Sequence, residues 1–358
     1  MHKTVIPFGP QHPVLPEPLQ LKIVCEGEKV VEAIPQIGYI HRGIEKGGEL
    51  KDFQQTVHLI ERTCGICSFI HAMTYCQGVE DLLGIEATPR AKYLRTAWAE
   101  MSRVHSHLLW LGLLADAIGF ESLFMQMWRI REKVLDLLEM TTGNRVIQSA
   151  CVVGGVRRDI DAQMAARIKV ELAKVKEDLD ELLPVLLTDY TLKVRTVGKG
   201  VLTKDQASLL GAVGPTGRAS GRNHDLRTLK YAAYGDMDFE PILETEGDSY
   251  ARALVRTKEI YQSIGMINRA LDKAPAGEIR VHPQSWPNGE AISRVEQPRG
   301  EVFYYIKGNG TRYLERLKIR TPTFANIPTL LVMLPGCEIA DLAVIVLSID
   351  PCISCTER

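Results

Sequence analysis

Apolar residues recur every three or four positions through the middle of the chain. Three such runs span residues 94–115, 123–138 and 160–182, and lysines and glutamates fill the opposite face of the third. A helix with one buried stripe has this spacing, because each turn takes 3.6 residues. We therefore expect three long helices that pack as a bundle.

Further helical segments lie on both sides of these runs. Residues 53–62 predict a helix that stops at Cys64-Gly65, and residues 68–83 predict a second that ends at Gly84. A further helix is expected at 250–271. Together these segments indicate a largely helical body.

The pattern changes to alternation near both ends of the chain. Residues 19–37 predict a hairpin around Glu26-Gly27-Glu28, and the strands VFYYIK and RYLERLKI flank Gly308-Asn309-Gly310, a strong turn signal. Residues 198–224 are rich in glycine and predict a long ordered loop.

These elements predict a mainly α fold with small β elements, in one domain. Its parts are a β-rich N-terminal region at 1–50, a helical body at 51–275, and a β-hairpin with a C-terminal segment at 276–358. No internal repeat or low-complexity linker divides the chain.

The composition excludes some classes of function. The chain has 358 residues, and its 43 lysines and arginines nearly balance its 44 aspartates and glutamates, so no global field attracts nucleic acid. The N-terminus lacks the pattern of a signal peptide. The apolar stretch 330–349 contains Glu338 and Asp341, which disfavour a membrane span, so we expect any membrane attachment to go through partners.

Four of the eight cysteines form two Cys-x-x-Cys pairs, Cys64/Cys67 and Cys352/Cys355. Two intervening residues let both thiolates of a pair face one ion, and Gly65 permits the tight backbone between them. A long chain with an ample core does not need disulfides, so metal ligation by reduced thiols is the better interpretation.

Thiolate ligands select zinc, nickel, copper(I) or iron–sulfur clusters. Zinc is the commonest choice, but zinc ribbons keep their pairs about 15–20 residues apart, whereas these pairs lie at opposite ends of the chain. A redox disulfide would leave the second pair unexplained.

His71, one helical turn after Cys67, can hydrogen-bond to a sulfur. The other cysteines lack cluster spacing, so we expect no iron–sulfur cluster in this chain; they are Cys25, Cys76, Cys151 and Cys337.

The segments RTCGICSFIH and DPCISC resemble the two cysteine signatures of nickel–iron hydrogenase large subunits. The resemblance implies that the four thiolates bind nickel, and that Cys67 and Cys355 also bridge to an iron carrying carbon monoxide and cyanide. The implied reaction is the reversible conversion of two protons and two electrons into dihydrogen.

The segments FGPQHP at 8–13 and GYIHRGIEK at 38–46 resemble the quinone-site subunit of respiratory complex I. This narrows the resemblance to energy-converting, Ech-like hydrogenases. It implies a small subunit with a 4Fe-4S cluster, further iron–sulfur and integral membrane subunits, ferredoxin as the electron partner, and a place on the cytoplasmic face of the cell membrane. The alternatives are a metal-free quinone-site subunit and a zinc-stabilised assembly subunit.

The resemblance also assigns roles near the metal. Glu17 matches a glutamate that relays protons, and Arg299 matches an arginine beside the diatomic ligands of the iron. Asp350 matches the aspartate that pairs with this arginine, and Arg320 is a weaker candidate. We treat His71, Glu17, Arg299 and Asp350 as the catalytic candidates.

Two departures from the family pattern affect these expectations. Glu45 matches a ligand of a structural magnesium or iron ion, but the chain ends in Arg358 instead of the usual histidine. Ser106 stands where many uptake hydrogenases have an aspartate, so we expect fewer acidic side chains around the metal. The neighbouring His105 and His107 fit either proton transfer or a place in the core.

Overall fold

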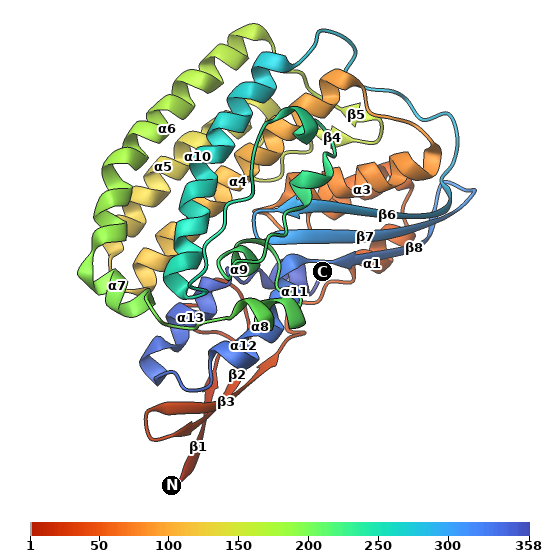
Figure 1. Ribbon diagram of the computed structural model, residues 1–358. Helices are drawn as coiled ribbons and strands as arrows, with labels where there is room; N and C mark the ends of the chain where they lie inside the picture. The colour runs from red at the N-terminus through yellow and green to blue at the C-terminus, as the bar shows by residue number, and fades with distance from the viewer. Residues whose placement is uncertain (1) are drawn as a thin grey trace.

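The computed structural model describes residues 2–358. An antiparallel sheet in the order β1-β2-β3 begins the chain, with β1 at Lys3–Phe8, β2 at Gln20–Glu26 and β3 at Lys29–Gln36. The hairpin expected at 19–37 is confirmed. Strand β1 was not predicted, because its short proline-containing run acquires strand character only by pairing with β2. This sheet projects from the main body (Figure 1).

Four long helices form the main body: α4 (Pro89–Ala117), α5 (Glu121–Thr142), α6 (Ala162–Thr188) and α10 (Ser249–Lys273). They pack alongside one another as the apolar stripes predicted (Figure 1). One of these helices, α4, begins about one turn before the first residue of its apolar stripe, after a residue whose side chain caps the helix. Thr88 accepts a hydrogen bond from the backbone N–H of Ala91 at the start of α4.

Two shorter helices lead into the bundle, α2 at Phe53–Glu61 and α3 at Ser68–Leu83. Gly84 ends α3 in the left-handed conformation, with φ of 62°, as its place after the periodic run predicted. The first cysteine pair occupies the short connection between α2 and α3.

A second antiparallel sheet covers one side of α3 (Figure 1). Its strands are β6 (Asn288–Gln297), β7 (Gly300–Asn309) and β8 (Leu314–Arg320). The predicted hairpin is β7–β8, and β6 is an additional strand that pairs with β7 up to Gln297 and Gly300. The tight connection between β6 and β7 therefore carries Arg299.

The glycine-rich segment at 198–224 is only partly a loop, because it holds α8 (Lys204–Leu209) and α9 (Gly214–Arg218). At Gly214, φ is +63° and an added Cβ would lie 2.3 Å from the carbonyl oxygen of Arg299. Glycine therefore lets α9 approach the connection that carries Arg299.

The remaining elements are α1 (Ile44–Glu49), β4 (Cys151–Val152), β5 (Gly155–Val156), α7 (Tyr190–Thr196), η1 (Leu226–Leu229), η2 (Tyr234–Asp236), α11 (Pro322–Asn326), η3 (Ile327–Thr329), α12 (Leu330–Met333), η4 (Ile339–Asp341), α13 (Leu342–Ser348) and α14 (Ile353–Thr356).

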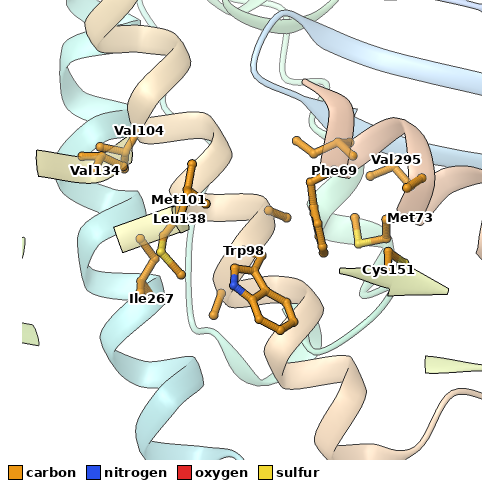
Figure 2. Packing of buried hydrophobic residues seen from close by; sticks show 14 of the residues in the cluster. Phe69, Met73, Trp98, Met101, Val104, Val134, Leu138, Cys151, Ile267 and Val295 are labelled. Atoms are coloured by element: carbon orange, nitrogen blue, oxygen red, sulfur yellow. The ribbon is translucent and has the colours of Figure 1, made fainter. Parts of the chain in front are cut away.

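The main hydrophobic core lies around α4. Met101 of α4 lies near Leu138 of α5 and Ile267 of α10 (Figure 2). On the other side of α4, Trp98 packs against Phe69 of α3. Phe69 and Trp98 have ring centroids 5.8 Å apart. Within residues 2–358, no helix is both long and apolar enough to cross a membrane.

Candidate metal centre

The two cysteine pairs meet in the interior, although they lie at opposite ends of the chain. The Sγ atoms of Cys64 and Cys352 are 3.3 Å apart, and those of Cys67 and Cys355 are 3.4 Å apart. The sulfurs of Cys64, Cys67 and Cys355 all lie within 4.8 Å of one another. Among residues 2–358, this is the one group of three or more histidine, cysteine or acidic side chains close enough to share a metal ion.

The guanidinium of Arg42 ties the two cysteine loops together. It donates hydrogen bonds to the carbonyl oxygens of Arg62 (2.7 Å) and Thr63 (2.8 Å), just before the first pair. It also donates to the carbonyl oxygen of Ser354 (3.0 Å), inside the second pair. One planar guanidinium therefore bridges both loops.

The C-terminal segment is anchored beyond the second pair. The carboxylate of Glu357 accepts hydrogen bonds from the backbone N–H groups of Gly38 and Ile40, and the ring of His41 contacts the carbonyl oxygen of Glu357 at 2.7 Å. These bonds explain how cysteines so near the end of the chain reach a buried position.

The four sulfurs are buried, which makes several negative charges in one place unfavourable. A hydrogen bond from Cys352 is the main reason that the pKa of Cys64 lies well below its ordinary value, whereas burial raises the pKa values of Cys67 and Cys355. A bound cation offsets such repulsion and holds its ligands as thiolates. The donor set therefore fits a soft or borderline metal, nickel and iron included.

His71 lies in the first turn of α3 and contacts the cluster directly. Its Nε2 atom is 3.3 Å from the Sγ of Cys355, and its Nδ1 atom is 2.7 Å from the hydroxyl oxygen of Tyr304. Burial lowers the pKa of His71 to about 4, which keeps the imidazole neutral near pH 7.

Arg299 and Asp350 form a buried ion pair next to the sulfurs. Nη2 of Arg299 donates to Oδ1 of Asp350 at 2.8 Å, and Nε donates to the carbonyl oxygen of Asp350 at 3.0 Å. Nη1 of Arg299 and Oδ2 of Asp350 have no hydrogen-bond partner among residues 2–358. Buried polar atoms left without partners are costly, so these two atoms can serve a small polar ligand or water.

Glu17 reaches the second cysteine pair from the N-terminal arm. One carboxylate oxygen accepts hydrogen bonds from the backbone N–H groups of Ile353 and Ser354, and the other accepts one from the hydroxyl of Ser354. The carboxylate therefore caps the start of the short helix α14, which follows Cys352 and contains Cys355. No pattern in the sequence indicated this structural contact.

Glu45 lies in α1 and contacts the C-terminal residue Arg358. Oε1 accepts hydrogen bonds from the N–H of Ile319 (2.8 Å) and from Nε of Arg358 (3.0 Å), and Oε2 contacts Nζ of Lys318 at 3.1 Å. Two cationic side chains thus already compensate this carboxylate. These surroundings do not fit a magnesium site, because cations repel a metal ion.

The structure also places the three residues that the sequence analysis treated as weaker candidates. Arg320 is exposed and pairs with Glu301 at 3.0 Å, so it does not join the cysteine cluster. His105 is buried and its Nε2 lies 2.7 Å from the carbonyl oxygen of Ile66, inside the first cysteine pair. The hydroxyl of Ser106 is buried and has no partner among residues 2–358.

His107 belongs to a buried network of charges that we did not predict from the sequence. Its Nε2 lies 2.8 Å from Glu259, which also binds Arg218 at 2.7 Å, and Arg218 in turn binds Glu296 at 2.7 Å. The other members are Glu100, Arg103, Asp225 and Arg227. For Glu100, Arg103 and His107, the available signal was charged or polar residues spaced three or four apart within the apolar run of α4.

Comparison with protein families gives two matches. The model of the respiratory-chain NADH dehydrogenase 49 kDa subunit matches residues 117–286 and 282–358. The model of nickel-dependent hydrogenases matches residues 42–116, which contain the first cysteine pair.

Several known proteins are similar over most or all of their length. The chain is 42% identical to the carbon monoxide-induced hydrogenase of Rhodospirillum rubrum, with 100% of both chains covered. It is 40% identical to the alpha subunit of the membrane-bound hydrogenase of Pyrococcus furiosus, covering 99% of this chain and 87% of that protein. It is 37% identical to one subunit of the F420H2 dehydrogenase of Methanosarcina mazei, covering 100% of this chain and 98% of that protein.

A solved structure has nearly the same fold. A chain of the membrane-bound sulfane sulfur reductase, an archaeal respiratory membrane complex, superposes with a TM-score of 0.95 at 31% identity. The match covers 99% of this chain and 98% of that chain.

Proposed function

The chain belongs to the family that unites the large subunits of energy-converting nickel–iron hydrogenases with the 49 kDa subunit of respiratory complex I, and we propose that it is a hydrogenase catalytic subunit. Its reaction is the reversible conversion of two protons and two electrons into dihydrogen. The observation that carries this proposal is the buried cluster of four thiols from the two ends of the chain.

In this proposal Cys64, Cys67, Cys352 and Cys355 hold nickel, and Cys67 and Cys355 also hold an iron that carries cyanide and carbon monoxide. When bound, the metal pair supplies the redox chemistry that splits or forms dihydrogen. Two observations support this ligand set: the sulfurs of Cys64, Cys67 and Cys355 lie within 4.8 Å of one another, and the sulfur of Cys352 lies 3.3 Å from that of Cys64. The cluster accounts for the four cysteines of the two pairs, which a metal-free subunit would not use.

Arg299 and Asp350 form one polar wall of the proposed centre. Because Asp350 fixes two donors of the guanidinium, the remaining Nη1 is held in place to donate to a diatomic ligand of the iron or to an incoming molecule. This preorganised donor costs no further ordering when a ligand arrives.

Glu17 is the proposed proton acceptor beside the second cysteine pair. Heterolytic chemistry needs a base near the metal, and a half-buried carboxylate at residues 352–355 meets that requirement. The proline-rich arm from Pro10 to Pro18, which includes Glu17, lines a solvent-facing pocket, which offers the proton a way out.

The proposed partners are those that the family resemblance implies, and a place in a larger assembly is supported by two relatives named as parts of a membrane-bound hydrogenase and of a respiratory membrane complex. They are a small subunit with a 4Fe-4S cluster, further iron–sulfur subunits and integral membrane subunits, with ferredoxin reached through them. Electron exchange with ferredoxin is coupled in this proposal to ion translocation. The chain then lies peripherally on the cytoplasmic face of the cell membrane.

A second candidate is a complex I-like quinone-site or electron-transfer subunit without hydrogenase activity. The match of the 49 kDa model to the larger part of the chain favours it. The four clustered thiols weigh against it, because quinone binding has no use for a buried set of soft metal ligands.

Metal analysis of the assembly that contains this chain tests the proposal. We expect about one nickel and one iron per chain, beyond the iron of the partner clusters, with infrared bands of carbon monoxide and cyanide. Cys64→Ser should lose nickel and hydrogen turnover, whereas Cys337→Ser, outside the cluster, should keep both. Zinc alone, or nickel retained in Cys64→Ser, contradicts the hydrogenase; quinone-dependent electron transfer without nickel supports the second candidate.

A further inference from the structure

The hydroxyl of Tyr304 contacts His71, the histidine that contacts the cysteine cluster. Tyr304 Oη, His71 Nδ1, His71 Nε2 and Cys355 Sγ form a line of contacts, at 2.7 Å between the first two residues and 3.3 Å between the last two. Tyr304 and His71 have no exposed surface, and Cys355 is 1% exposed. Water therefore does not compete for these bonds.

The pleat of β7 explains how a tyrosine reaches this position. Val302, Tyr304 and Ile306 are buried on the face that packs against α3, whereas Phe303 and Tyr305 lie on the other face and are partly exposed. Gly78 of α3 lets the helix approach the sheet closely, because an added Cβ would lie 2.8 Å from Ile306. Tyr304 is therefore held beneath the first turn of α3, where His71 lies.

The number of hydrogens in this line fixes the direction of both bonds. A neutral imidazole carries one N–H, and a thiolate bound to a metal can only accept. Nε2 of His71 must then donate to Cys355, which leaves Nδ1 as an acceptor. The hydroxyl of Tyr304, fully buried and 2.7 Å from Nδ1, then donates its hydrogen to that nitrogen.

We propose that Tyr304 is a positioning residue of the metal centre, which fixes the tautomer of His71 so that His71 donates a hydrogen bond to the thiolate of Cys355. The inference rests on the proposed ligation of a metal by these thiolates. With the other tautomer, a nitrogen lone pair would face the sulfur lone pairs and repel them. A donated hydrogen bond withdraws charge from the sulfur and so tunes the metal that the sulfur binds.

Cobalt(II) loaded into the full chain tests this inference without hydrogen turnover, because cobalt–thiolate absorption bands report the electron density on sulfur. Tyr304→Phe should shift the charge-transfer band to longer wavelength, since the weakened hydrogen bond leaves the sulfur easier to oxidise. Tyr305→Phe, the neighbour on the opposite face of β7, is the matched control and should leave the band in place.

A double substitution shows whether Tyr304 acts through His71. His71→Gln should shift the band by itself, and adding Tyr304→Phe should then change nothing further, because the two residues form one line of contacts. An unshifted band in Tyr304→Phe overturns the inference, as does a Tyr304→Phe shift that persists in His71→Gln. Failure of the unmodified chain to give any cobalt–thiolate band instead overturns the ligand set, and with it the proposed function.

Discussion

The carboxylate of Glu17 accepts a hydrogen bond from the backbone N–H of Ser354 at 2.9 Å, so a residue of the N-terminal arm holds the turn that carries the last two cysteines. The resemblance assigned Glu17 to proton transfer. The structure adds an anchoring contact, and the two roles respond differently to substitution.

Glu17→Gln separates a proton relay from an anchor. The amide keeps one oxygen acceptor for α14 but cannot take up a proton, so hydrogen–deuterium exchange should fall sharply while nickel content and melting temperature change little. Glu17→Ala removes the cap and should also lower stability, by about 1 kcal/mol. Normal isotope exchange in Glu17→Gln would refute the relay.

Arg299→Lys tests the polar wall of the centre. Lysine cannot donate to both the carboxylate and the carbonyl of Asp350 from a rigid plane, so the free donor loses its position. We expect hydrogen turnover to fall about 10- to 100-fold with nickel content retained. Arg294→Lys, at an exposed position of β6, is the control, and equal turnover in both variants would contradict the role.

Arg218→Met tests the buried charge network. The substitution leaves Glu259 and Glu296 without their shared partner in a fully buried place. Breaking such a pair costs about 3–5 kcal/mol, measured as a lower melting temperature or denaturation midpoint. Lys258→Met, which removes an exposed pair with Glu244, should cost less than about 1 kcal/mol. Similar losses in the two variants would show that the network is not a special source of stability.

Glu61 makes stability depend on pH. Burial raises the pKa of its carboxyl group from 4.5 to about 7, so the folded chain binds the proton more tightly than the unfolded chain. Stability should therefore fall as pH rises from about 4.5 to 7, by up to about 3 kcal/mol. In Glu61→Gln, the unfolding midpoint should no longer fall as pH rises through this range. At pH 8 its midpoint should exceed that of the unmodified chain. Glu278→Gln, at an exposed position, should keep the slope, and an unchanged slope in Glu61→Gln would contradict the buried carboxyl.

The cations around Glu45 predict that the protein does not depend on magnesium at this position. Because Arg358 and Lys318 already compensate the carboxylate, chelation of magnesium should leave the melting temperature unchanged. A drop on chelation that disappears in Glu45→Gln would instead support a metal there.

The sequence by itself determined the long helices and the identity of the proposed metal ligands. The period of the apolar residues defined α4, α5, α6 and α10, because a helix that buries one stripe needs that spacing whatever it packs against. The two Cys-x-x-Cys pairs are local signals, since the spacing of two thiolates for one ion is set by a few backbone bonds.

The tertiary structure alone decided what meets the cysteines. Contacts such as Glu17 with Ser354 and Tyr304 with His71 join residues hundreds of positions apart, and no periodicity encodes them. Strands β1 and β6 escaped prediction for the same reason, since a strand is stabilised by hydrogen bonds to a neighbour that the local sequence does not contain. The buried network around Arg218 likewise exists only because helices, a strand and a loop place opposite charges together away from water.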